Sequence, residues 1–171
     1  KEFDYKDYKV DGTVGRRPSV RAIIIRDNRL AMVYSARYDY YMFAGGGIEE
    51  GEDMSNALIR EIKEELGLEV IPDSIKEYGL IVRKEKGMFD DLFFQENYFF
   101  TCDVTGIVIN QNLEDYENFE QYELRWVTPE EAIETNLTHS HEAQANQVFT
   151  KRFMDRECWL IRNLMEAGFF S

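Results

Sequence analysis

Three glutamates near the middle of the chain have the residue type and spacing that bind divalent cations. Glu61, Glu64 and Glu65 lie three and four residues apart, so on a helix their carboxylates point off one face. Two like charges about 5 Å apart repel by roughly 3 kcal/mol at an effective dielectric near 20. Mg²⁺ and Mn²⁺ prefer oxygen ligands, so a bound ion offsets this repulsion and also bridges to phosphate oxygens. The cluster therefore favours metal-assisted chemistry on a phosphorylated compound.

The residues around this cluster decide whether it is more than a charged surface. A run of acids alone is usually a solvated helix face. Here Arg60 precedes Glu64 by four residues and can hold a carboxylate by paired hydrogen bonds. The glycines at 45–47 allow close backbone approach. The loop between them and the helix adds three more acids, Glu49, Glu50 and Glu52.

An amphipathic helix is expected to carry the three glutamates. Leu58, Ile62 and Leu66 recur every four residues within 53–66 and form an apolar stripe on another face from the acids. Gly67 follows directly and suits the C-terminal cap of such a helix. The stripe is expected to be buried, which leaves the carboxylates at the edge of the core.

Short strands and two further helices surround this helix in the sequence. The turn at Asp27–Arg29 joins the first two strands into a hairpin. Residues 105–110 continue as a strand or a loop, and a short helix starts at Thr128-Pro129. Because no regular β-α-β alternation occurs, the chain predicts an α/β sandwich with a mixed sheet. The expected strands are 20–26, 30–35, 38–43, 76–84, 92–103 and 123–127.

A long C-terminal helix is expected over residues 142–167. Phe149, Phe153, Leu160 and Leu164 lie on one side of it. This stripe is typical of a helix that packs on the core. A contact between two copies of the helix in a homodimer is the alternative.

The stretch from Gly46 to Leu68 resembles the Nudix box, G-x5-E-x7-R-E-U-x-E-E-x-G-U, where U is aliphatic. A chance match at a given start is on the order of one in a billion, so the motif is specific. Every specified position is filled, by Gly46, Glu52, Arg60, Glu61, Ile62, Glu64, Glu65, Gly67 and Leu68.

This resemblance to the MutT-like Nudix hydrolases implies a fold, an activity and a set of site residues. The fold is an α/β/α sandwich. The activity is Mg²⁺- or Mn²⁺-dependent cleavage of a diphosphate linkage, in a nucleoside diphosphate linked to another group or in a nucleoside triphosphate. By the box, Glu61, Glu64, Glu65 and the Gly46 carbonyl are the expected metal ligands. Arg60 is expected to orient the carboxylates, Glu64 to act in catalysis, and Glu52 to support the loop.

A further acid outside the box is expected at Glu120. It opens the segment E-Q-Y-E-L-R-W, which is similar to a recurrent acidic arrangement in the family, and it serves either as a metal ligand or as the general base. A plain surface glutamate is the alternative. Glu96 is a weaker candidate because it can point outward from a strand. His139 and His141 lie in an expected loop and are less favoured bases.

Length and composition agree with one domain over residues 1–171, of which 1–17 form an N-terminal extension. The 171 residues are 44% hydrophobic and suffice for a buried core. Cys102 and Cys158 form no C-x-x-C pair, which favours reduced thiols and a cytoplasmic protein, although one disulfide stays open. No run of apolar residues is long enough to cross a membrane.

The net charge of −13 opposes binding to a nucleic-acid polymer but not to a small phosphorylated substrate carried by a metal ion. Two other functions remain open: a Nudix module that senses a nucleotide without turnover, and a relative of the prenyl diphosphate isomerases. No residue in the sequence selects the substrate. The aromatics around Tyr38, Tyr40, Tyr41, Phe93 and Tyr98 can stack on a base but more often belong to the core or the sheet surface.

Overall fold

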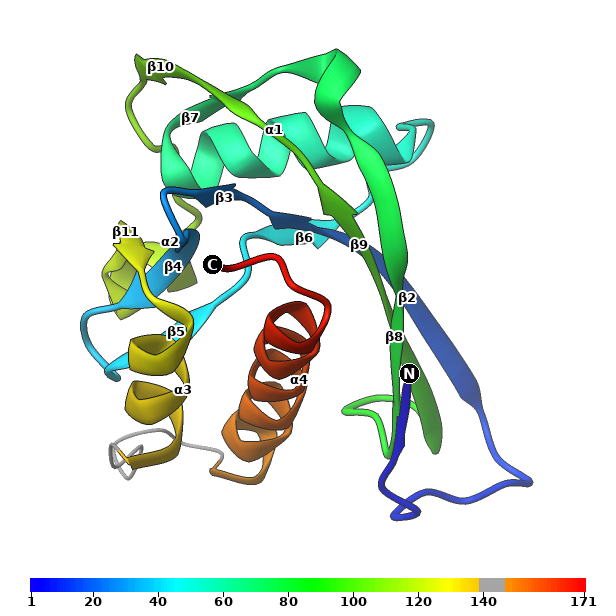
Figure 1. Cartoon of the computed structure of the whole chain (residues 1–171). Coiled ribbons are helices and arrows are strands. Elements are labelled where there is room, and N and C mark those ends of the chain that lie inside the picture. The colour runs from blue at the N-terminus through cyan, green and yellow to red at the C-terminus, as the bar shows by residue number, and fades with distance from the viewer. Residues whose placement is uncertain (139–146) are drawn as a thin grey trace.

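The computed structural model describes residues 1–138 and 147–171 and has three layers (Figure 1). Strands form the middle layer. Helix α1 (Met54–Leu66) covers one side of it, and α3 (Pro129–Thr138) with α4 (Gln147–Glu166) covers the other. The expected α/β/α sandwich with a mixed sheet and a long C-terminal helix is confirmed. In the part of the chain that the structure describes, no helix is long and apolar enough to cross a membrane.

The largest sheet contains the glycines at 45–47, which form strand β6. Its order is β1-β8-β9-β2-β6, with β2 parallel to β9 and antiparallel to β6. Val20 of β2 faces Gly46 of β6 in this register, which places the glycine loop on a sheet edge. The bounds are β1 (Glu2–Asp4), β2 (Val14–Ile23), β6 (Gly45–Gly47), β8 (Lys76–Glu85) and β9 (Leu92–Thr101).

Two smaller sheets complete the strand layer. In the first, β4 lies between β11 and β3 and also pairs with β5, while β7 and β10 form the second. The turn at Asp27-Asn28, with positive φ at both residues, confirms the expected hairpin. The bounds are β3 (Ile25–Arg26), β4 (Arg29–Ser35), β5 (Tyr40–Met42), β7 (Leu68–Val70), β10 (Val104–Val108) and β11 (Tyr122–Val127).

Several elements differ from the sequence prediction. Strand β2 begins at Val14, well before the predicted start, and runs through Pro18, which is tolerated because β6 pairs only with Ser19–Arg21 on that side. The glycines at 45–47, expected only as a permissive loop, form β6. The short elements β1, β7, η1 (Pro72–Ser74) and α2 (Asp115–Glu120) were not predicted. The predicted start of the last helix at 142 and both histidines lie outside the described residues.

Two hydrophobic cores lie on the two sides of the strand layer. On one side the α1 stripe of Leu58, Ile62 and Leu66 is buried as predicted. On the other side Leu160 and Leu164 of α4 are buried among the strands. Phe153 is partly buried, and the side chain of Phe149 lies outside the described part of the structure. The last helix is therefore a core element.

Both ends of α1 are fixed by local contacts. The Asp53 side chain accepts a hydrogen bond from the Asn56 N–H (2.7 Å) at the start. At the end, Gly67 adopts φ 64°, and a Cβ there would lie 2.2 Å from the Ile109 carbonyl oxygen. Only glycine suits this conformation and this contact. These ends set the direction in which α1 presents its carboxylates to β6.

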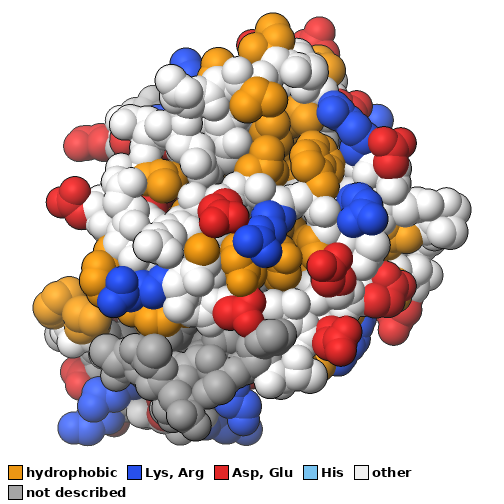
Figure 2. All heavy atoms as spheres, turned by 90° about the vertical axis from the view of Figure 1, so that its left-hand side faces the viewer, with side chains coloured by type: hydrophobic (Ala, Val, Ile, Leu, Met, Phe, Trp, Pro, Cys, Tyr) orange, Lys and Arg blue, Asp and Glu red, His pale blue; other side chains and the backbone are white. Residues whose placement is uncertain are grey.

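Charged side chains are dispersed over the face of the molecule shown in Figure 2. Acidic and basic groups alternate there around hydrophobic side chains, so the charge of −13 is not gathered into one acidic patch on that face. Cys102 and Cys158 are both free and buried, which agrees with the expectation of reduced thiols.

Candidate active site

Arg60 links the loop acids to the helix acids. Its Nε and Nη2 donate to the two carboxylate oxygens of Glu52 at 2.8 and 2.9 Å, a paired arrangement that lowers the pKa of Glu52. Its Nη1 donates to Glu61 Oε1 at 2.8 Å and lies 3.4 Å from Glu64 Oε2. Its Nη2 also donates to the Gly47 carbonyl at 3.1 Å. One guanidinium therefore fixes the loop against the helix.

Glu61 and Glu65 are buried carboxylates at the end of β6. Only 9% of Glu61 and 2% of Glu65 is exposed. Burial raises the pKa of both, that of Glu65 well above its usual range, while Arg60 lowers the pKa of Glu61. Glu65 Oε2 accepts a hydrogen bond from the Gly45 N–H at 2.9 Å. Buried carboxyl groups of this kind ionise most readily when a cation lies next to them.

Gly46 is required by the close packing of Glu61. A Cβ at this position would lie 2.5 Å from Glu61 Oε1. Any side chain would therefore displace the carboxylate from the backbone of the loop. This contact gives a physical reason for the first glycine of the box and brings the backbone of β6 beside the acids.

Glu64 differs from its two neighbours in accessibility. Its side chain is 30% exposed, against 11% for Glu61, and its ion pair with Arg60 is the longer of the two. The three box acids on α1 therefore comprise two buried groups and one that solvent can reach.

Glu117 is an acid of the site that the sequence did not reveal. It lies on α2, is 3% exposed, and its charge contributes to the raised pKa values of Glu61 and Glu65. Tyr116 Oη donates to it at 3.0 Å, and the Glu114 N–H donates to it at 2.8 Å. The sequence feature that could have indicated it is the E-x-x-E spacing of Glu114 and Glu117, which is typical of a capping box at the start of a helix.

Glu120 lies at the other end of α2 and faces different partners. Tyr40 Oη donates to its Oε2 at 2.6 Å, and Ser35 Oγ lies 3.4 Å from the same oxygen. Glu120 shares a pocket wall with Glu65, but its charge is not among the main influences on Glu61 or Glu65. Its role as a ligand or base stays a prediction. Glu96 instead pairs with Arg16 at 2.7 Å.

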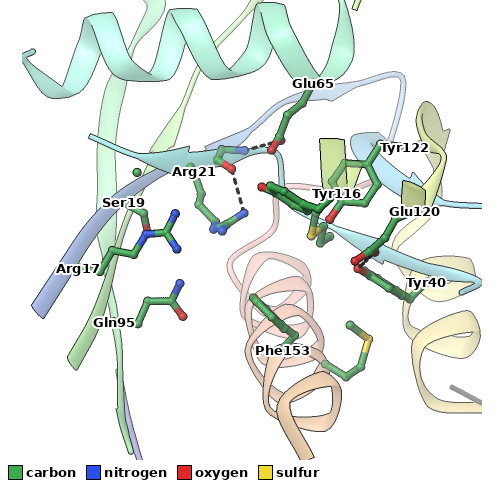
Figure 3. Close-up of a pocket in the computed structure, with 15 residues that line it drawn as sticks. Arg17, Ser19, Arg21, Tyr40, Glu65, Gln95, Tyr116, Glu120, Tyr122 and Phe153 are labelled. Carbon is green, nitrogen blue, oxygen red and sulfur yellow. Dashed lines mark hydrogen bonds between the residues drawn. The ribbon is translucent and has the colours of Figure 1, made fainter. Parts of the chain in front are cut away.

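A cavity of about 340 Å³ opens beside the buried acids (Figure 3). Strands β2 and β9 supply Arg17, Arg21 and Gln95 on one side. Phe153 of α4 and Tyr116 supply aromatic surface. Tyr40, one of the aromatics predicted mostly as core, is buried yet also lines this cavity. We call this the first cavity. Its wall is acidic at one end, carries arginines on one side and includes aromatic rings.

Arg17 is the accessible cation of the first cavity. Its guanidinium lies close to Gly47, where an added Cβ would be 3.5 Å from Nη2. Among the described residues it has no hydrogen-bond or ion-pair partner, whereas Arg21 is held by the Phe43 carbonyl at 2.8 Å. Arg17 also lines the hollow around Gly46, Arg60 and Glu61. It can therefore meet an anion that approaches the buried acids.

The donors at this site fit a hard divalent cation. They are all oxygens, from the carboxylates of Glu61, Glu64 and Glu65 and from the β6 backbone. Within residues 1–138 and 147–171, no three acidic, histidine or cysteine side chains stand in the positions of a formed metal site. Arg60 instead neutralises Glu61 and Glu64. Arg60 makes no ion pair with Glu65 among the described residues, so a metal ion would add to the effect of Arg21 in favouring the charged form of this buried carboxylate.

Comparisons with known proteins agree with this geometry. The sequence model of the NUDIX domain matches residues 15–151. The chain is also 29% identical, over 97 residues, to a protein of Escherichia coli named nucleoside triphosphatase NudI; the match covers 57% of this chain and 67% of that protein.

Solved structures share the fold. The solution structure of the E. coli ORF135 protein superposes with a TM-score of 0.57 at 22% identity and covers 91% of this chain and 94% of its own. The MutT protein from Bacillus halodurans superposes with a TM-score of 0.55 at 18% identity, over 70% of this chain and 72% of its own.

Fold and site together define an α/β/α sandwich whose loop-helix motif presents acids to a ligand-sized cavity. Because the NUDIX match spans most of its length, the chain belongs to the Nudix hydrolase family. The prediction of an enzyme that acts on phosphorus-containing acid anhydrides is thereby confirmed at the level of the family.

Proposed function

We propose that this protein is a Mg²⁺- or Mn²⁺-dependent pyrophosphohydrolase that cleaves the diphosphate linkage of a nucleotide. The observation that carries the proposal is the pair of buried carboxylates, Glu61 and Glu65, packed on the glycines of β6. Glu65 lines the first cavity, Glu61 lines the neighbouring hollow, and Arg17 lines both. Buried acids without enough cations nearby favour a metal ion. Arg17 supplies positive charge where the phosphates of the substrate enter.

Each residue of the site has a role in this proposal. Glu61, Glu64, Glu65 and the Gly46 carbonyl hold the metal, which supplies charge neutralisation of the phosphates and lowers the pKa of water. Arg60 is a positioning residue because it reaches the substrate only through Glu61 and Glu64. Glu52 fixes Arg60 by two hydrogen bonds. Glu117 adds negative charge beside Glu61.

Glu64 is the proposed general base. It is the most accessible of the box acids that Arg60 contacts on α1, so it can meet a water molecule beside the substrate. The proton of the attacking water passes to its carboxylate, the water oxygen bonds to phosphorus, and the anhydride P–O bond breaks. The leaving phosphate oxygen keeps the bonding electron pair, and Arg17 stabilises its charge.

A nucleotide fits the rest of the first cavity. Tyr116 offers a ring face that can stack on a base, and Gln95 offers a hydrogen-bonding amide. The Phe153 ring, which lies against the Arg83 and Arg156 guanidinium groups, adds apolar surface to the wall. The similarity to a protein named nucleoside triphosphatase supports a nucleoside phosphate as the substrate. We further propose that residues 1–171 act as one domain, and that the free thiols reflect a cytoplasmic protein.

The test is a panel of nucleoside triphosphates and nucleoside diphosphate-linked compounds, assayed for phosphate, diphosphate and nucleoside monophosphate. With Mg²⁺ at least one compound should be hydrolysed, and EDTA should abolish the reaction. Glu64→Gln should lose most activity without loss of fold, while Glu69→Gln, an exposed glutamate on β7, should not. Binding without turnover would support the nucleotide-sensing alternative, and isomerisation without hydrolysis the prenyl diphosphate alternative. Either outcome, or activity in EDTA, contradicts the proposal.

A further inference from the structure

The three glycines of β6 have no side chains that could fix the backbone beside the box acids. Glycine adopts conformations that other residues avoid, so a run of three keeps one conformation only when neighbouring groups hold it. Gly45 has φ 147°, and a Cβ there would lie 1.9 Å from the Val20 carbonyl oxygen. Its backbone therefore lies against β2 in a conformation that suits glycine alone. The contacts of Gly45 consequently determine where the backbone enters the box.

Two charged side chains hold the two sides of Gly45 (Figure 3). Glu65 Oε2 accepts from its N–H at 2.9 Å, and Arg21 Nη1 donates to its carbonyl oxygen at 3.4 Å. The same Arg21 nitrogen donates to the Phe43 carbonyl at 2.8 Å. Arg21 therefore joins the carbonyls on either side of Ala44, directly before the expected metal ligand Gly46.

Arg21 is itself fixed to the largest sheet. Its Nε donates to Asn97 Oδ1 at 3.2 Å, and Asn97 is 0% exposed on β9, the neighbour of β2. Ser19 Oγ and Arg156 Nη1 donate to the same oxygen at 3.1 and 2.9 Å. Because Asn97 is held by several partners, Arg21 forms a rigid link between the sheet and the glycines of β6.

Arg21 differs from Arg17, the other arginine of β2 in the wall of the first cavity. Arg17 is exposed and also lines a second cavity of about 660 Å³ at the end of the β8–β9 hairpin. Arg21 is 7% exposed, and its hydrogen bonds in the described part of the chain all go to groups of the fold. Arg17 is therefore placed to meet a ligand, and Arg21 to hold the backbone of the site.

The charge of Arg21 has an effect beyond its hydrogen bonds. Its acceptors within residues 1–138 and 147–171 are neutral carbonyl and amide oxygens, and a buried cation without a paired counterion costs stability. A neutral donor would suffice to hold two carbonyls. The charge acts on Glu65 instead, since Arg21 lowers the pKa of this carboxylate against the effect of burial. Arg21 thus serves the carboxylate as well as the backbone.

We propose that Arg21 is a positioning residue of the metal site. It fixes residues 43–45 so that the Gly46 carbonyl and Glu65 keep the arrangement that a divalent cation needs, before the cation arrives. Arg60 holds Glu61 and Glu64, so the two arginines divide the box acids between them. The inference rests on the proposed function, because it takes the box acids as the metal ligands.

The test combines Mn²⁺ binding with hydrogen exchange in the metal-free protein. Arg21→Lys keeps the charge, but its donors share one nitrogen and cannot span Asn97 and both carbonyls. It should weaken Mn²⁺ binding about tenfold and lower kcat by about 10–100-fold on a compound that the wild type hydrolyses, with an unchanged KM. Without metal, the Gly45 amide should exchange about tenfold faster in nuclear magnetic resonance spectra, as expected when a hydrogen bond to a charged group is lost.

Two further variants separate positioning from stability. Arg83→Lys changes another buried arginine, on β8, which pairs with Glu85 at 3.3 Å. It should lower the free energy of unfolding in urea and leave Mn²⁺ affinity and Gly45 exchange unchanged. Arg21→Gln suits the neutral acceptors, so it folds even if a buried lysine prevents folding. It should weaken Mn²⁺ binding at least as much as Arg21→Lys.

Wild-type Mn²⁺ affinity in the folded Arg21 variants would overturn the assignment, and so would an unchanged exchange rate of Gly45. A raised KM with wild-type kcat would also overturn it, because Arg21 would then meet the substrate directly. If the wild type itself binds no Mn²⁺, the proposed function fails instead. Exchange of Gly45 in the metal-free protein still tests the contact of Arg21, so the two failures are distinguishable.

Discussion

Arg60 connects both the loop and the helix of the candidate site through one guanidinium group. Its fork holds Glu52 through two oxygens while the same guanidinium reaches Glu61 and the Gly47 carbonyl. A lysine keeps the charge but offers no planar fork that matches these acceptors together. We therefore expect Arg60→Lys to lower kcat by about 10–100-fold, with a native circular dichroism spectrum. Wild-type kcat in this variant would show that the Arg60 contacts do not position the site.

Glu117 and Glu120 are the two candidates for an acid outside the box that contributes to metal binding. Glu117 is buried where its charge acts on Glu61 and Glu65, and Glu120 is held by Tyr40. Glutamine can keep the capping contact of residue 117 on α2. Glu117→Gln should therefore raise the Mg²⁺ concentration needed for half-maximal activity, while Glu120→Gln should leave it unchanged. The opposite result in a Mg²⁺ titration would favour Glu120, the residue that the sequence indicated.

At the residue scale, the sequence predicted what spacing along one element determines. Glu61, Glu64 and Glu65 could be grouped because helix geometry alone brings them to one face. Glu117 and Arg17 could not, since their proximity to the box depends on how α2 and β2 are placed by the sheets. Residues of this second kind require the tertiary structure.

At the scale of elements, the C-terminal end of α1 determines where the carboxylates point. Gly67 combines a left-handed conformation with a carbonyl contact that excludes a Cβ. Gly67→Ala should lower the free energy of unfolding by about 1–3 kcal/mol, measured by urea denaturation. Gly79→Ala is the control, because Gly79 has open space around it and no positive φ. Equal stabilities of the two variants would contradict this role.

Helix α4 holds the backbone just before β6 through buried charges. Glu157 Oε2 accepts from the Phe43 N–H at 2.7 Å, its other oxygen accepts from Arg156 Nε, and both side chains are fully buried. Glu157→Gln leaves the Arg156 charge without its counterion, which should cost about 3–5 kcal/mol of stability. Arg162→Ala, at an exposed position of α4, should cost little in the same denaturation experiment. A small cost for Glu157→Gln would mean that Asn97, which also accepts from Arg156, suffices.

Long periodic elements were predictable, and short ones were not. The stripe of α1 and its glycine cap follow from the sequence, because they repeat over several turns. Helix α2 has six residues and no repeat of apolar positions, and β1 exists only through its pairing with β8. The early start of β2 likewise depends on β9 as a partner, which supports the backbone through Pro18.

At the scale of the whole molecule, four arginines of this strongly acidic chain line two adjacent cavities. Arg17, Arg21, Arg83 and Arg152 all line one or both of them. Composition therefore predicts a phosphorylated ligand only in combination with the box, because a charge of −13 by itself argues against anionic ligands. The location of these cations is a property of the assembled sheets and α4.

A direct titration of the metal-free protein with Mn²⁺, followed by electron paramagnetic resonance, tests the central claim that the box acids hold the metal. Wild-type protein and Glu69→Gln should bind Mn²⁺ with the same affinity. Glu64→Gln should bind it about tenfold more weakly or worse. Equal binding by Glu64→Gln, or no binding by the wild type, would contradict the account.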